Sequence, residues 1–148
     1  MNKNQLTLVR DSFELLRPLP KGFGLSFYER LFELDPSLRP LFRGHLENQA
    51  SMFVTALGFI VADMSEAGSF SRAINELGAR HHSLEISDAT YTRFGEALLW
   101  TLEQRLGEHF TPDVREAWAA AYSTLAEALK RSVEAARRSE EERAHAMP

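Results

Sequence analysis

Apolar residues recur every three or four positions along almost the whole chain, and prolines or glycines separate one such stretch from the next. This spacing places apolar side chains on one face of a helix, whereas a half-buried strand needs strict alternation. No stretch alternates well enough to fit a strand better than a helix. The pattern predicts about seven helices, over residues 6–16, 21–34, 36–42, 46–64, 69–81, 88–107 and 111–138. A chain of 148 residues with this pattern is expected to form one all-α domain.

Three of the predicted helices begin with clear start signals. Asp35, Ser87 and Thr111 each stand immediately before a helical stretch, and proline follows two of them. Side-chain oxygens of these residue types accept hydrogen bonds from the first free backbone amides, and proline fits the first helical turn. Only a few residues separate the last two predicted helices, which favours an antiparallel hairpin.

Composition excludes several classes of function. The chain has 17 basic and 21 acidic residues, a net charge of −4, so it lacks the basic excess of a nucleic-acid binder. It has no cysteine, which excludes disulfides, thiolate metal sites and iron–sulfur clusters. Its longest apolar run, over 53–64, is too short to span a membrane, and its first residues do not form a secretory signal. We therefore expect a cytoplasmic protein with neither nucleic-acid nor membrane partners.

Four places in the chain combine chemically useful side chains with apolar helix faces. They hold Tyr28, Phe42, Gln49 and the pair His81-His82. Each has an ordinary structural explanation when taken alone: a tyrosine at the edge of the core, a core phenylalanine, a glutamine at the rim of an apolar face, and a hydrogen-bonded histidine. No common catalytic motif is present, so any function depends on these residues acting together.

Taken together, several short segments follow one another in a specific order. They are Phe27-Tyr28-Glu29-Arg30-Leu31-Phe32, Pro36, Pro40-Leu41-Phe42, Gln49, Phe53, Leu77-Gly78-Ala79-Arg80-His81, Tyr91, Glu116-Ala117-Trp118 and Tyr122. This order resembles the globin family, most closely the bacterial single-domain haemoglobins and the haem domain of flavohaemoglobins. The resemblance covers about residues 6–130. It implies a globin fold around a haem pocket, with a globin domain over 1–138 and a charged tail over 139–148 that frays.

The resemblance also implies a cofactor, haem b, which is held without covalent bonds because no cysteine can form a thioether. His81 is then the proximal ligand of the haem iron. His82 is its rival, but the family places the ligand ten residues before a tyrosine, here Tyr91. Phe42 is expected to pack on the haem. Arg80 is a candidate partner for a haem propionate, with a solvated arginine as an equal alternative.

On the opposite side of the haem, the resemblance makes Tyr28 and Gln49 the polar distal pair, lined by Phe53 and Leu57. A tyrosine hydroxyl and a glutamine amide can each donate a hydrogen bond to the partial negative charge of bound dioxygen. Such bonds are worth about 1.5–3 kcal/mol each, so two of them slow oxygen loss by about 10²–10⁴ as an upper range.

The sequence departs from the flavohaemoglobin pattern in two places. In that family a tyrosine, here Tyr91, and a glutamate polarise the proximal histidine, but the glutamate position falls on Val133. Glu134 is one residue late, and one residue turns a helix by about 100°. We therefore expect less imidazolate character at the histidine. The second departure is the large Phe53, which is expected to narrow the distal pocket.

These residues leave three hypotheses for function. The first is reversible binding of dioxygen with oxidation of nitric oxide to nitrate, which needs a separate electron-donating reductase because the chain has no flavin- or nicotinamide-binding pattern. The second is an oxygen or redox module for storage, delivery or sensing without turnover. The third is a haem-free protein that acts through protein contacts. The set Tyr28, Phe42, Gln49 and His81 argues against the third, and nothing in the sequence separates the first two.

Overall fold

The computed structural model describes residues 2–16, 20–41, 45–64, 67–81 and 86–146. Within these ranges it contains six α-helices, two short 3-10 helices and no strand, which confirms the all-α prediction. The elements are α1 (Lys3–Glu14), α2 (Pro20–Leu34), η1 (Pro36–Leu41), α3 (Leu46–Asp63), α4 (Ala67–His81), α5 (Asp88–Leu106), η2 (Gly107–His109) and α6 (Pro112–Ala146). None of the helices in the described part of the chain is long and apolar enough to cross a bilayer.

The predicted start signals act as caps. Ser87 Oγ accepts a hydrogen bond from the Thr90 amide at 3.2 Å, and Thr111 Oγ1 accepts one from the Val114 amide at 3.2 Å. Asp35 accepts one from the amide of Ser37 at 3.1 Å and so begins η1. These contacts lie within three residues along the chain, which is why the sequence alone located them.

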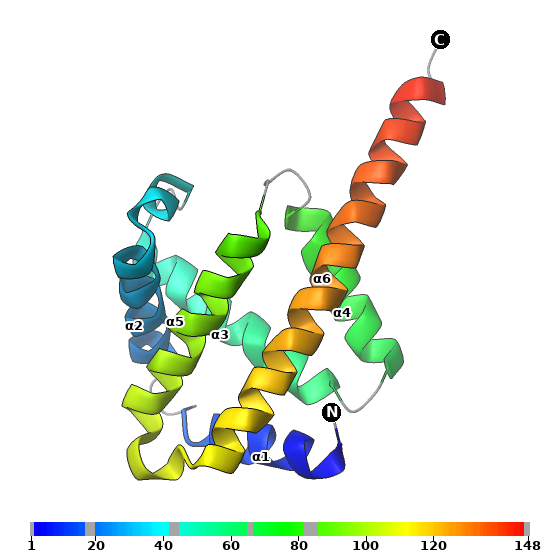
Figure 1. Ribbon diagram of the computed structural model, residues 1–148. Coiled ribbons are helices and arrows are strands. Elements are labelled where there is room, and N and C mark those ends of the chain that lie inside the picture. Colours follow the sequence, from blue (N-terminus) through cyan, green and yellow to red (C-terminus); the bar gives the residue numbers. More distant parts are fainter. Residues whose placement is uncertain (1, 17–19, 42–44, 65–66, 82–85, 147–148) are drawn as a thin grey trace.

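The last helix is longer than the sequence pattern predicted. We expected it to end near Arg138, but α6 continues to Ala146. Its final turns extend beyond the other helices in Figure 1. Ala, Glu and Arg favour helix, and neither proline nor glycine interrupts α6 after Pro112, so nothing local stops it. The division into a globin domain over 1–138 and a tail over 139–148 stays a prediction.

Figure 1 shows α5 and α6 as the predicted antiparallel hairpin, with α3 and α4 behind it and α2 at one side. The helix α2 packs against α3 and α5, whereas α6 packs against α1 and α4. The core between them is apolar, and its largest fully buried side chains include Trp118, Phe23, Leu31 and Leu102. The indole nitrogen of Trp118 donates to the buried Ser12 Oγ at 2.8 Å, which joins α6 to α1.

Candidate functional site

A cluster of aromatic rings fills the contact between α2 and α3. The ring of Phe53, on α3, stacks on Phe27 of α2 with centroids 4.3 Å apart and lies 6.4 Å from Phe23. Tyr28 meets the same Phe53 ring edge-on at 5.8 Å. Because Phe53 packs against the rings of α2, the structure brings two of the predicted distal residues, Tyr28 and Phe53, into direct contact. That Phe53 narrows a ligand pocket stays a prediction.

The side chain of Tyr28 is buried among aromatic rings. Only 6% of this residue is exposed, and its ring also meets Phe27 at 5.2 Å and Phe32 at 6.0 Å. Burial raises the pKa of Tyr28 to about 12, because the phenolate would lose its hydration. Near neutral pH the side chain therefore keeps its proton and remains a hydrogen-bond donor.

The other predicted distal residues share one face of α3. Gln49 is half-buried one turn before Phe53, and Leu57 is buried one turn after it. Gln49 therefore shares a helix face with Phe53 and Leu57 and is partly exposed. The joint contact of Tyr28 and Gln49 with one ligand stays a prediction.

The predicted proximal residues are described only in part. His81 is the last residue of α4, which fixes the position of its backbone. The side chains of Arg80 and His81, and all of residues 42 and 82, lie outside the part of the chain that the structure describes. The roles assigned to Phe42, Arg80, His81 and His82 therefore stay predictions.

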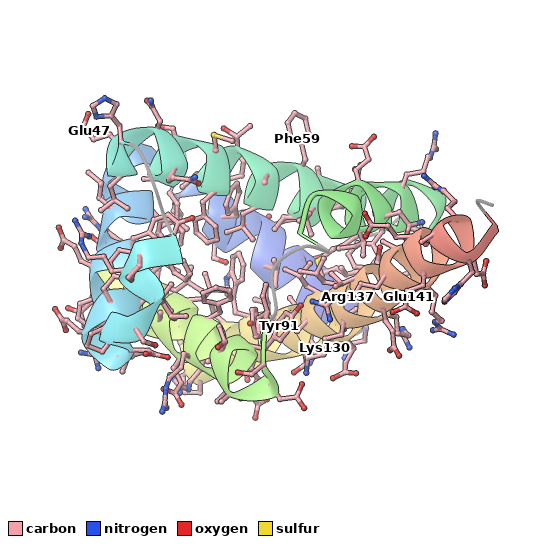
Figure 2. The ribbon with its side chains drawn as sticks, turned by 90° about the horizontal axis from the view of Figure 1, so that it is seen from above. Glu47, Phe59, Tyr91, Lys130, Arg137 and Glu141 are labelled. Atoms are coloured by element: carbon pink, nitrogen blue, oxygen red, sulfur yellow. The ribbon has the colours of Figure 1, made fainter. Side chains whose placement is uncertain are left out.

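Tyr91, at the start of α5, has charged neighbours on α6. The Lys130 ammonium lies 4.9 Å from the centre of the Tyr91 ring and 3.2 Å from an Asp88 carboxylate oxygen. Figure 2 shows Tyr91 near Lys130 and Arg137. Burial raises the pKa of Tyr91, and the positive charges of Lys130 and Arg137 oppose that rise. The Tyr122 hydroxyl donates to the Tyr91 carbonyl at 2.5 Å.

Sequence reasoning missed Lys130, because no pattern connects two residues that lie on different helices and 39 positions apart. It did predict that Val133, and not Glu134, occupies the position of the flavohaemoglobin glutamate on the last helix. Val133 is buried, with 8% of its surface exposed, whereas Glu134 is exposed. The carboxylate is therefore turned out of the core, and an apolar side chain occupies the inward position.

A groove of about 540 Å³ lies elsewhere, between α2, α5 and α6, and its lining includes Arg30, Trp100, Arg115 and Tyr122. None of the residues predicted for the site line this groove. It therefore has no part in the candidate site.

The residues present fit a haem better than a chelated metal ion. Among the described residues, no group of three or more His, Asp or Glu side chains could hold a metal ion. Instead, one helix ends at a histidine, and the α2–α3 contact offers aromatic rings and the buried, protonated hydroxyl of Tyr28. A large apolar porphyrin with one imidazole ligand matches this set, whereas a bare cation needs several charged or polar ligands.

Comparison with known proteins gives a consistent result. The family model named Globin matches residues 25–129. A neuroglobin of Danio rerio is 27% identical over 139 residues, which cover 84% of this chain and 87% of the relative. An anaerobic nitrite reductase of Physcomitrium patens is 23% identical, with 92% of this chain and 84% of the relative covered. A flavohemoprotein of Bacillus subtilis is 24% identical over 87% of this chain, which spans only 33% of that protein.

Among solved structures, the hemoglobin of the botfly Gasterophilus intestinalis superposes with a TM-score of 0.81. The match covers 90% of this chain and 99% of the botfly chain at 11% sequence identity. This likeness confirms the predicted fold.

Proposed function

Because this chain belongs to the globin family, we propose that it is a haem protein of the bacterial single-domain type that binds dioxygen reversibly in the cytoplasm. Membership of the family supports the haem and the binding of dioxygen. The buried, protonated Tyr28 hydroxyl in the α2–α3 contact is the observation that carries the finer part of the proposal.

The cofactor is haem b, with His81 as the iron ligand. Phe42 would pack on the porphyrin, Arg80 would pair with a propionate, and Tyr91 would support the histidine side. When bound, the haem would supply an iron that can bind a diatomic ligand. The position that holds glutamate in flavohaemoglobins is the buried Val133 here, so we expect the His81 imidazole to have less imidazolate character than in that family.

Tyr28 and Gln49 hold the ligand from the distal side. Tyr28 donates a hydrogen bond and keeps its proton, since its pKa of about 12 leaves the hydroxyl neutral near pH 7. Gln49 donates from its amide at the rim of the same face. Phe53 and Leu57 keep water away, which strengthens both hydrogen bonds and slows oxidation of the iron.

We further propose that the protein oxidises nitric oxide to nitrate when a separate reductase supplies electrons. The reaction joins nitric oxide and dioxygen with one electron, NO + O₂ + e⁻ → NO₃⁻. Similarity to a flavohemoprotein over one third of its length supports this role. The buried Val133 favours a second candidate, an oxygen or redox module for storage, delivery or sensing without turnover.

Haem titration tests the cofactor and its ligand. The purified chain should give a Soret band with haemin, and His81→Ala should lose stable binding while His82→Ala keeps it. The absence of a Soret band in the wild type would overturn the proposal. The reverse pattern between the two variants would assign the ligand to His82.

Stopped-flow mixing with nitric oxide then separates the two candidate functions. The oxygenated protein should form nitrate and ferric haem in a single turnover, steady turnover with NADH alone should be negligible, and an added flavin reductase should restore it. If even the first turnover fails, the storage or sensing role stands in place of nitric oxide oxidation.

A further inference from the structure

Helices α4 and α6 approach each other closely where Gly78 faces Ser132. A Cβ atom added to Gly78 would lie 2.8 Å from Ser132 Cβ and 3.2 Å from the Ser132 carbonyl carbon. The side-chain oxygen of Ser132 would lie closer still. Real Cβ atoms essentially never come within 3.0 Å of another atom, and Ser132 Cβ, unlike the oxygen, is attached directly to the backbone and cannot turn away. Any side chain larger than hydrogen at position 78 would therefore push the two helices apart.

A hydrogen bond fixes the rotation of α4 at the same place. Ser132 Oγ donates to Asn75 Oδ1 at 3.1 Å, so Ser132 contacts α4 at two positions three residues apart. Ile74 and Val133, next to these positions on α4 and α6, are both buried. The contact thus combines buried apolar neighbours with a hydrogen bond at the exposed edge of the α4–α6 interface, and both resist a shift of α4.

His81 ends the same helix three residues after Gly78. Three residues correspond to about 4.5 Å along the axis and leave the two side-chain directions about 60° apart. A shift of α4 at Gly78 is therefore carried to position 81 almost undiminished, because a helix of this length moves as a rigid body over one turn.

We propose that Gly78 and Ser132 are positioning residues for the proximal histidine: their close contact sets the distance and rotation of α4 relative to α6, and so the place of the His81 imidazole. The inference depends on the proposed function, in which His81 binds the haem iron. Neither residue touches the haem in this account. They act through the backbone of α4.

Two measurements on the haem-loaded protein test this role. One is the iron–histidine stretching band in the resonance Raman spectrum of the ferrous, ligand-free protein. The other is the rate at which haem is lost to an excess of an apoglobin acceptor. Gly78→Ala should shift or broaden the band and speed haem loss about tenfold, the usual scale for overpacking a tight contact.

The double variant Gly78→Ala with Ser132→Gly removes the Ser132 atoms closest to the new methyl group, so it should restore much of both signals. Ser132→Ala deletes only the hydrogen bond to Asn75 and should speed haem loss about threefold. It also keeps the test decisive if Gly78→Ala does not fold. Gly58→Ala, where the new Cβ meets Phe13 on α1 at 3.3 Å, is the matched control and should change neither signal.

The outcomes separate this inference from the proposed function. If His81→Ala retains the wild-type band, the ligand assignment is wrong and the inference fails with it. If His81→Ala loses the band while Gly78→Ala and Ser132→Ala keep wild-type bands and haem-loss rates, only the inference is overturned. Rescue in the double variant, with no change in Gly58→Ala, would establish the positioning role.

Discussion

The contact between α2 and α3 and the contacts of α6 with α4 and α5 are built from different chemistry. Between α2 and α3, aromatic rings stack without any charge, with Phe27 and Phe53 4.3 Å apart. The backbones also meet there, since a Cβ on Gly24 would lie 2.8 Å from the Ala50 carbonyl carbon. Burial of apolar surface therefore stabilises this side of the molecule.

Polar groups join α6 to its neighbours. Ser132 hydrogen-bonds Asn75 of α4, and Lys130 pairs with Asp88 at the start of α5. The Asp88 carboxylate is almost fully exposed, with 92% of its side chain accessible, so water and salt weaken this ion pair. The α2–α3 contact is therefore stabilised by apolar burial, whereas the contacts of α6 add exposed polar pairs to an interface that also buries Ile74 and Val133.

Among these variants, Phe27→Ala should have the largest effect on stability. The residue is 4% exposed and stacks on Phe53, so we expect the free energy of unfolding to fall by about 3–5 kcal/mol. Urea unfolding of the purified protein measures this change. Phe59→Ala, at a position 66% exposed, is the control and should cost under about 0.5 kcal/mol. Equal losses of unfolding free energy in the two variants would show that the α2–α3 cluster is not a main source of stability.

Alkaline pH should act on the same cluster. The pKa of Tyr28 is about 12 when folded and near its ordinary value of 10 when unfolded, so the unfolded state loses the proton first. The contribution of the buried Tyr28 to the free energy of unfolding is intact below pH 10 and is lost as the pH rises through about 12. It amounts to about 2–3 kcal/mol. The free energy of unfolding, measured across this pH window, should fall less steeply with pH in Tyr28→Phe than in the wild type. Some slope remains in the variant because its other tyrosines still titrate. Identical slopes would contradict the burial of this hydroxyl.

The rate of oxygen release tests the functional role of residues in and beside the same cluster. Tyr28→Phe should raise the oxygen dissociation rate about tenfold, the equivalent of one lost hydrogen bond to a polarised ligand. Gln49→Leu should raise it less, since a half-buried glutamine loses more rotamers when it binds. Stopped-flow displacement of oxygen by carbon monoxide gives both rates. Unchanged rates in both variants would show that neither side chain touches the ligand.

The smallest effect is expected where α6 meets the start of α5. Lys130→Met removes the ion pair to the exposed Asp88 and the cation above the ring of the buried Tyr91. The loss of stability should be far below that of Phe27→Ala and should disappear at about 1 M salt, where exposed charges are screened. Thermal unfolding at low and high salt measures it. A large loss that salt does not remove would place a main stabilising contact on this side.

Much of the fold followed from local patterns. The spacing of apolar residues located the helices, and Ser87 and Thr111 capped the helices that they preceded. The differences lie at helix ends: α6 runs on to Ala146 because no local stop signal marks its end, and α1 and α4 begin earlier than predicted, at Lys3 and Ala67. Within the candidate site, the sequence placed Gln49, Phe53 and Leu57 on one face of α3, because residues three or four apart share a helix face.

Contacts between distant residues required the tertiary structure. The ring of Phe53 turns toward Phe27, Lys130 lies over Tyr91, and Gly78 meets Ser132, although each pair is many residues apart in the chain. The sequence by itself determined that this protein is helical, because periodicity and capping act within a few residues, and the order of its short motifs carried the resemblance to the globins. Only the tertiary structure decided which helix faces meet and how closely, because that depends on the simultaneous packing of side chains from all the helices.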